Sequence, residues 1–356
     1  MFKDLLRYPI IQAPMAGGAS NPKLAAAVSN AGGVGFLAAG YKTAREMKDE
    51  IEQTRRLTEF PFGVNVFVPG NEVIDENSVS AYREKIEQAA ESVGASVGNA
   101  VADDDDDDWD NKLTVLKASQ VDFVSFTFGC PESRIIRDLQ SAGSLIIVSV
   151  TNLQEAKRAA GAGADVLCVQ GIEAGGHRAS FENSTEDDYG LLVLIRMIEK
   201  DLNVPIIAAG GLMHGKDIAA VLAAGAMAAQ LGTAFLRCPE SGASPIHKAA
   251  LSNPRFSHTA VTRAFSGRRA RGLVNHFITE YDHAAPAAYP HIHHMTKQMR
   301  KVAAQKSNPE YMALWAGQGY KLSKEIPASE LVELLVKELK SVRGVYGDGD
   351  KKVIQE

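Results

Sequence analysis

The stretch PIIAAGGLMHGKDIAAVLAAGA, residues 205–226, contains one complete strand, turn and helix. Its apolar run Pro205–Ala209 predicts a short strand that is buried on both faces, because no polar residue alternates within it. Two glycines follow. The alanine-rich segment His214–Ala224 then predicts a helix, and Gly225 stands just past its end, where a left-handed cap is favoured. Such a unit predicts a parallel strand followed by a helix that covers the sheet.

The same unit recurs along the chain. Seven further apolar runs predict strands: Ile10–Gln12, Val34–Leu37, Phe62–Phe67, Val121–Phe126, Leu145–Val150, Val166–Gln170 and Ala228–Leu231. Helix-like segments lie between most of them: Asn21–Ala31, Thr43–Thr54, Pro131–Ser141, Leu153–Ala160 and Tyr189–Asp201. Asn21 and Asn152 stand where helix N-caps are favoured. Eight such strands predict an α/β protein of the closed (β/α)8 TIM-barrel type. An open doubly wound sheet is the alternative, although no GxGxxG motif follows the first strand.

Composition excludes several classes of protein. The chain has 356 residues, of which 45% are hydrophobic and 23% charged, as in ordinary globular proteins. Its formal net charge of -5 and its lack of basic runs argue against a nucleic-acid partner. Three distant cysteines form neither a disulfide framework nor a CxxC metal motif. No apolar stretch is long enough to span a bilayer, so we expect a cytoplasmic protein that has no membrane partner.

Two segments interrupt the alternation of strands and helices. Residues 71–112 and 239–310 are predicted to form a smaller, mostly helical substrate or lid region. Residues 1–70 and 113–238 would form the barrel, with C-terminal helices within 311–356 packing back on it. The first interruption ends in the acidic run Asp103–Asp108, which predicts a solvated, mobile loop, because adjacent aspartates do not converge on a metal as a calcium-binding loop does.

Glycines and polar residues collect after the predicted strands, where a TIM barrel places its active site. They are Pro14 and Met15 after the first strand, Asn65 on the third, Gln170, Gly175 and Gly176 after the sixth, Gly210 and Gly211 after the seventh, and Gln230, Leu231, Gly232 and Thr233 at the eighth. Glycine turns free backbone N–H groups, and a following helix N-terminus favours an anion. The last two turns therefore predict a phosphate-bearing cofactor. FMN is a frequent occupant of such barrels, and Asn65 and Gln170 would then hydrogen-bond its ring edge.

His177 follows the glycine pair of the sixth loop and is the candidate catalytic residue. An imidazole with a pKa near ~6.5 could donate a hydrogen bond to a substrate oxygen or remove a proton from carbon. Arg178 could attract an anion or form a surface salt bridge, and Glu173 is predicted to anchor the loop. Cys130 is predicted to be a packed thiol.

No metal site is predicted. Asp282 and His283 precede His291, His293 and His294, but HxH spacing alone is a weak metal signal. The segment is interpreted as the surface of the lid.

Seven motifs resemble the FMN-dependent nitronate monooxygenases, formerly called 2-nitropropane dioxygenases. They are QAPMAGGASNPKLAAAVSNAGGVGFLAAGY (12–41), FGVNVFVP (62–69), QGIEAGGHR (170–178), PIIAAGGLMHG (205–215), QLGTAFL (230–236), TRAFSGRRARG (262–272) and LWAGQGY (314–320). The resemblance covers residues 8–320 and implies a TIM barrel with a small substrate domain. It implies FMN contacts at Asn65, Gln170, Gly175, Gly211 and 230–233, and a catalytic His177. Ala179 departs from the glycine that often follows GHR in this family.

The resemblance also implies a reaction: oxidative denitrification of alkyl nitronates, such as propionate 3-nitronate, by dioxygen, which gives a carbonyl compound and nitrite or nitrate. Two alternatives stay open. One is an FMN-dependent NAD(P)H reductase of the same superfamily, either an enoyl-acyl-carrier-protein reductase or an NADH:quinone reductase. The other is a non-enzymatic phosphate-ligand binding protein. The expected partners are the small-molecule nitronate and O2, and assembly as a homodimer is left open.

Overall fold

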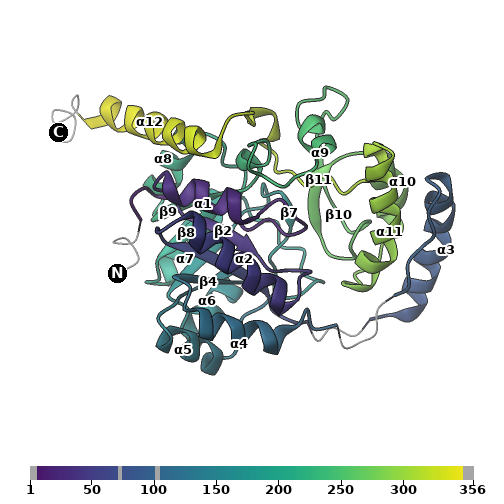
Figure 1. Cartoon of the computed structure of the whole chain (residues 1–356), viewed down its shortest axis with the longest axis horizontal. Helices are drawn as coiled ribbons and strands as arrows, with labels where there is room; N and C mark the ends of the chain where they lie inside the picture. Colours follow the sequence, from purple (N-terminus) through teal and green to yellow (C-terminus); the bar gives the residue numbers. More distant parts are fainter. Residues whose placement is uncertain (1–5, 71–73, 101–104, 348–356) are drawn as a thin grey trace.

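A closed barrel of parallel strands forms the body of the molecule (Figure 1). The computed structural model describes residues 6–70, 74–100 and 105–347. The barrel strands are β1 (Ile10–Gln12), β2 (Gly35–Ala38), β3 (Phe62–Phe67), β4 (Phe123–Thr127), β5 (Leu145–Val150), β6 (Val166–Gln170), β8 (Ile206–Ala209) and β9 (Ala228–Leu231). Their order is β1-β9-β8-β6-β5-β4-β3-β2, and a parallel bridge between Ile11 and Val34 brings β1 and β2 together. The predicted (β/α)8 TIM barrel is confirmed, and the open sheet is wrong.

Helices surround the barrel. They are α1 (Pro22–Asn30), α2 (Ala44–Leu57), α4 (Trp109–Ser119), α5 (Ser133–Ser141), α6 (Leu153–Ala162), α7 (Leu191–Asp201), α8 (Gly215–Ala223) and α12 (Ala328–Gly347). The predicted caps are confirmed: Asn21 accepts a hydrogen bond from Leu24 N, and Asn152 accepts one from Glu155 N, each at 2.9 Å. Gly225 has a φ of +111°, as a left-handed cap requires. No helix within the described ranges is long and apolar enough to cross a membrane.

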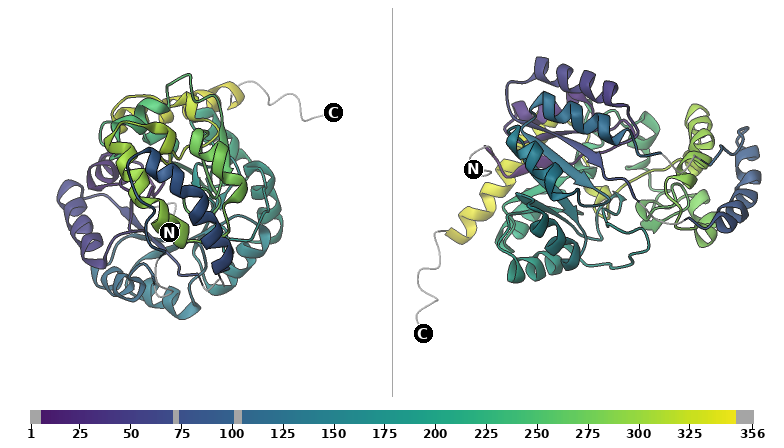
Figure 2. Two further views of the ribbon diagram at one scale, coloured as in Figure 1. Left: turned by 90° about the vertical axis from the view of Figure 1, so that its right-hand side faces the viewer. Right: turned by 90° about the horizontal axis from the view of Figure 1, so that it is seen from below.

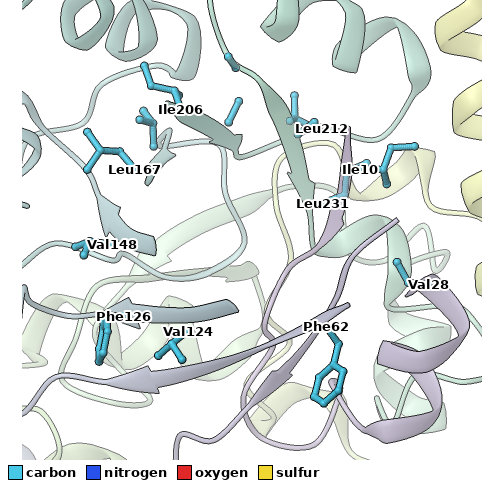
Figure 3. Packing of buried hydrophobic residues seen from close by; sticks show 14 of the residues in the cluster. Ile10, Val28, Phe62, Val124, Phe126, Val148, Leu167, Ile206, Leu212 and Leu231 are labelled. Atoms are coloured by element: carbon cyan, nitrogen blue, oxygen red, sulfur yellow. The ribbon is translucent and has the colours of Figure 1, made fainter. Parts of the chain in front are cut away.

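The apolar runs are nearly continuous because each barrel strand is buried on both faces. On β6, Val166 and Cys168 point into the barrel, where they pack with residues such as Ile207. Leu167 and Val169 point outward and pack under the helices. Figure 3 shows this outer layer, in which Leu167 lies near Val148 of β5 and Ile206 of β8, its partners on the two neighbouring strands. Side chains alternate across a strand, so both faces of β6 need apolar residues.

A second group of elements lies beyond one end of the barrel, as Figure 1 and the right-hand view of Figure 2 show for α3, α10 and α11. It contains α3 (Glu76–Ser92), α9 (Pro245–Ala250), α10 (His276–Tyr281), α11 (His291–Gln305) and a sheet of β10 (Thr259–Thr262), β11 (Ala270–Leu273) and β7 (Gly176–His177). Its apolar cluster includes Tyr82 of α3, Phe277 of α10 and Met295 of α11. The division into separate domains stays a prediction.

The smaller region is mostly helical, as expected, and residues 239–310 also contain the short strands β10 and β11. These strands lack an apolar run because they pair with each other and with the two-residue β7 outside the main core.

The acidic run is bound more tightly than the expected solvated loop would be. Asp107 Oδ2 lies 2.7 Å from the buried Lys112 Nζ, and Asp107 Oδ1 accepts from Tyr41 N at 2.9 Å. Asp108 accepts from Ala44 N at 2.6 Å, at the N-terminus of α2. Burial raises the pKa of Asp107 to about 6. Asp103 and Asp104 lie outside the described residues.

Candidate active site

A cavity of about 470 Å³ opens at the carboxyl ends of the barrel strands. Twelve of the thirteen predicted site residues line it: Pro14, Met15, Asn65, Gln170, Gly175, Gly176, His177, Gly210, Gly211, Gln230, Gly232 and Thr233. The volume lies within the usual range for small-molecule and cofactor sites. The strand ends therefore bring the predicted residues together around one space.

Leu231 is the exception. Its side chain is 1% exposed and packs in the core between barrel and helices. Because side chains alternate along β9, Gln230 faces the cavity and Leu231 points the other way. The predicted contact of Leu231 with FMN stays a prediction, and its buried side chain cannot make that contact.

The turns after β8 and β9 present backbone donors to the cavity. Gly211 has a φ of +69°, a conformation that glycine adopts most readily. Within the described part of the chain, the N–H groups of Gly211, Gly232 and Thr233 have no hydrogen-bond partner. Thr233 Oγ1 accepts from Gly317 N at 2.9 Å, so its own hydrogen is left to donate elsewhere. This group of donors is suited to an anion.

Two amide side chains lie on the barrel floor. Asn65 Nδ2 donates to Ser125 Oγ at 2.9 Å and to Thr127 Oγ1 at 3.0 Å, and its Oδ1 meets no donor among the described residues. Gln170 Nε2 donates to the His177 carbonyl at 3.1 Å. Gln170 Oε1 accepts from Arg178 Nη1 at 2.9 Å. Asn65 can therefore accept a hydrogen bond from a ligand, whereas Gln170 already holds the histidine loop.

Arg178 has neither of its predicted roles. It is 2% exposed, it does not line the cavity, and it donates to the Gly171 carbonyl at 2.7 Å. Both the surface salt bridge and the direct attraction of an anion were wrong, because the side chain turns inward behind β6. Glu173 does anchor the loop, since its carboxylate accepts from Leu191 N at 3.0 and 3.2 Å.

His177 lies on β7 in an aromatic enclosure. Its ring centroid lies 5.4 Å from that of Trp315, 5.8 Å from Phe128 and 6.0 Å from Tyr289. Burial, together with the charges of Arg268 and Arg300, lowers the pKa of His177 to about 3. The expected pKa near ~6.5 was wrong, because aromatic residues from three distant segments remove the ring from water. The imidazole is neutral at physiological pH.

Ser266 controls which nitrogen of His177 carries the proton. Its Oγ lies 2.8 Å from His177 Nε2 and 3.1 Å from the Arg268 carbonyl. When the hydroxyl donates to Arg268, His177 must donate through Nε2. When it donates to His177 instead, the imidazole proton lies on Nδ1. One serine rotation thus allows His177 to face a ligand as donor or as acceptor.

Several lining residues were not predicted. Ser266 and Trp315 lie within the motifs TRAFSGRRARG and LWAGQGY, so the motifs alone could have marked them. Tyr41, His293 and Arg300 also line the cavity. His293 and Arg300 are seven residues apart, two turns along one face of α11, a spacing equally typical of a structural helix face.

The other reactive side chains have structural surroundings. Cys130 is buried, and burial raises the pKa of its thiol. Asp282 accepts from Thr262 Oγ1 at 2.7 Å, and His294 lies 2.9 Å from Asp105. Among residues that the structure describes, no group of three or more histidines, cysteines and acidic residues is placed to hold a metal ion.

The chain matches known proteins along nearly its whole length. The family model described as nitronate monooxygenase matches residues 1–338. A nitronate monooxygenase of Pseudomonas aeruginosa is 40% identical over 345 residues, which cover 94% of this chain and 97% of that protein. A probable nitronate monooxygenase of Bacillus subtilis is 38% identical over 343 residues, covering 95% of this chain and 98% of that protein.

Solved structures agree with these relatives. The nitroalkane oxidase from Streptomyces ansochromogenes is 49% identical, with a TM-score of 0.94 over 97% of this chain and 99% of that one. FabK from Thermotoga maritima is 28% identical, with a TM-score of 0.76 over 97% of both chains. The match of fold, motifs and length shows that the chain belongs to the nitronate monooxygenase family, whose members are flavin-dependent oxidoreductases.

Proposed function

We propose that this enzyme binds FMN in the cavity and oxidises alkyl nitronates with O2 to carbonyl compounds and nitrite or nitrate. One observation carries the proposal. A single cavity joins the unpartnered N–H groups of Gly211, Gly232 and Thr233 to the enclosed, neutral imidazole of His177. The first set fits a phosphate, and the second fits a small anion that must be held away from water.

The residues present fit FMN. Its phosphate would be held by Gly211, Gly232 and Thr233, while Asn65 Oδ1 is free to accept from the ring edge. The backbone of Pro14 and Met15 would line the same space. When bound, FMN supplies the redox chemistry, because it can take electrons from an electron-rich anion and pass them to dioxygen.

His177 would hold the nitronate. A nitronate oxygen is a hydrogen-bond acceptor, and a neutral imidazole can donate to it through the nitrogen that Ser266 leaves protonated. The rings of Phe128, Tyr289 and Trp315 exclude water from this contact. A hydrogen bond to an anion gains strength in such a low-dielectric enclosure.

The low pKa also separates the two roles considered for His177. A base whose conjugate acid has a pKa of about 3 holds a proton weakly. Proton removal from a neutral nitroalkane is therefore disfavoured, and hydrogen bonding to a preformed nitronate is favoured. We propose that nitronates, rather than nitroalkanes, are the better substrates.

The test is to purify the protein, release any bound flavin, identify it by chromatography, and measure O2 consumption with propionate 3-nitronate. We expect FMN and O2 uptake that depends on the nitronate, with slower uptake for 3-nitropropionate, whose nitroalkane carbon is still protonated. Protein that contains no flavin and takes up no added FMN would contradict the cofactor. A flavoprotein that oxidises NADH or NADPH and leaves the nitronate unchanged would be a reductase. Binding of FMN without turnover of either substrate class would indicate a binding protein.

A further inference from the structure

One cavity wall, which we call the far wall, lies opposite the turns after β8 and β9 that are proposed to bind the phosphate, and it carries a cation. Around the barrel, β3 and β4 lie four strands away from β8 and β9 respectively. Phe67 at the end of β3 and Phe128 just after β4 line this far wall, and Tyr41 joins them from the segment after β2. Tyr41 stacks on His293 of α11, with ring centroids 4.3 Å apart and an interplanar angle of 5°. Arg300 lies beside His293.

Two of the three guanidinium nitrogens of Arg300, Nε and Nη2, have hydrogen-bond partners among the described residues. Nε donates to Thr296 Oγ1 at 3.1 Å, and Nη2 donates to the His293 carbonyl at 2.9 Å. Nη2 also lies 3.3 Å from His293 Nδ1. These contacts stay within α11 and orient the guanidinium. Nη1 has no partner in the described part of the chain, and no described carboxylate lies within ion-pair distance of Arg300.

The far wall therefore holds a charge without a counter-ion. Among the described residues that line the cavity, none is Asp or Glu, and Arg300 is the one Lys or Arg. Burial lowers the pKa of Arg300 to about 10, so the guanidinium stays cationic at neutral pH. Burial also lowers the pKa of His293 and raises that of Tyr41, which leaves both uncharged. A half-buried cation that has no carboxylate partner among the described residues is suited to an anionic ligand group.

This position is separate from the one proposed for the nitronate. The rings of His177 and His293 both contact Tyr289, with ring centroids 6.0 Å and 6.4 Å from that of Tyr289. His177 and Arg300 line the same cavity from different elements, β7 and α11. A short carbon chain that carries two anionic groups can therefore contact both.

We propose that Arg300 binds a carboxylate at the end of the substrate away from the nitronate, so that the enzyme selects nitronates that carry a second negative charge. This inference rests on the proposed function of the cavity. Nη2 is held by His293, whereas Nη1 has no partner among the described residues, so the N–H groups of Nη1 can donate to the carboxylate in a charge-assisted hydrogen bond. Arg300 is thereby a specificity-determining residue.

The experiment compares two nitronates of equal chain length, propionate 3-nitronate and propyl 1-nitronate, which lacks the carboxylate. In Arg300→Met, kcat/KM for propionate 3-nitronate should fall on the order of 10–100-fold, mainly through KM, as expected for a lost bond between charged groups. The value for propyl 1-nitronate should change less than about threefold. Arg300→Lys keeps the charge but loses the planar guanidinium that Thr296 and His293 orient, so it should restore part of the loss.

Lys301→Met is the matched control, because Lys301 is an exposed cation on the same helix. It removes one positive charge from α11 without changing the cavity, and both substrates should keep their wild-type constants. Equal losses on both nitronates in Arg300→Met would overturn the proposal, since the arginine would then hold the nitronate or the fold. Unchanged constants for both would overturn it as well.

A binding measurement separates this inference from the proposed function. Succinate is an unreactive dianion of similar length, and its binding to the purified flavoprotein can be followed by thermal shift. Wild-type protein should bind succinate on the order of 10–100-fold more tightly than butyrate, and Arg300→Met should lose that difference. If wild-type protein turns over neither nitronate, the proposed function fails while the succinate result still decides the role of Arg300. Equal binding of succinate and butyrate by wild-type protein would overturn the inference.

Discussion

Replacing Gly175 with alanine tests whether the histidine loop must pack directly on the segment after Trp315. A Cβ at Gly175 would lie 2.4 Å from Gly317 N and 2.5 Å from the Ala316 carbonyl carbon. Both atoms are backbone, so no side chain can move aside. Ordinary carbon contacts need about 3.5 Å, and the two segments would have to separate by about 1 Å. The same separation would pull Gly317 N away from Thr233 Oγ1.

Overpacking of this kind costs about 1–3 kcal/mol. With an unfolding entropy of about 2.1 cal/mol/K per residue, a 356-residue chain should lose about 1–4 °C in Tm. Bound flavin should fall as well, because His177 and Thr233 lie on the two sides of the contact. Thermal unfolding and the ratio of flavin to protein absorbance measure both effects.

Gly161→Ala is the matched control for this prediction. Gly161 is exposed within α6, and a Cβ there meets nothing within 4 Å. The same substitution should therefore stabilise the protein by up to about 1 kcal/mol, because alanine favours a helix over glycine. If Gly175→Ala keeps both Tm and flavin, the close packing of the two segments is refuted.

Three further predictions concern charged and titratable groups. His177→Asn should lower kcat/KM for propionate 3-nitronate about 10–100-fold while the protein keeps its flavin. The control His258→Asn, at an exposed histidine, should keep wild-type kcat/KM. Full activity in His177→Asn would contradict the role of His177. Between pH 6 and 9, the pH profile of kcat/KM for this nitronate should contain no inflection from His177, because the pKa of His177 is lowered to about 3. A decrease of kcat/KM below pH 6.5 that disappears in His177→Asn would count against this. Lys112→Met should destabilise the protein by about 1–3 kcal/mol at pH 8 but less at pH 5. The substitution leaves Asp107 buried without its cation, and this burial costs little only when the carboxyl group is protonated. Because the pKa of Asp107 is already raised to about 6, that group is protonated at pH 5 and ionised at pH 8. Equal losses of Tm at the two pH values would refute that coupling.

The barrel could be predicted from sequence because its strands leave a strong local signal. Phe62–Phe67, Leu145–Val150 and Val166–Gln170 form strands with the predicted bounds, since burial on both faces demands an unbroken apolar run. The helix α3 was predicted only as part of a mostly helical region without bounds, although its buried residues Val79, Tyr82 and Ile86 have the spacing of an amphipathic helix. Their packing partners lie almost two hundred residues away, in the segment from Ala264 onward.

The candidate site was predictable wherever backbone geometry requires particular residues. Gly210 and Gly211 adopt positive φ angles, and glycine marks such turns in a sequence. The far wall left no such signal. Tyr41 and Arg300 meet only because α11 folds over the barrel mouth, and helical spacing does not reveal what a helix faces. The neutral state of His177 likewise depends on residues from three separate segments.

Anaerobic mixing tests the central claim most directly. Purified enzyme is mixed with propionate 3-nitronate in one sample and with NADH or NADPH in another, and the flavin absorbance is followed without O2. Nitronate oxidation predicts that the nitronate bleaches the flavin, that O2 restores the colour, and that neither nicotinamide does so at a comparable rate. Bleaching by NADH or NADPH together with indifference to the nitronate would contradict the account.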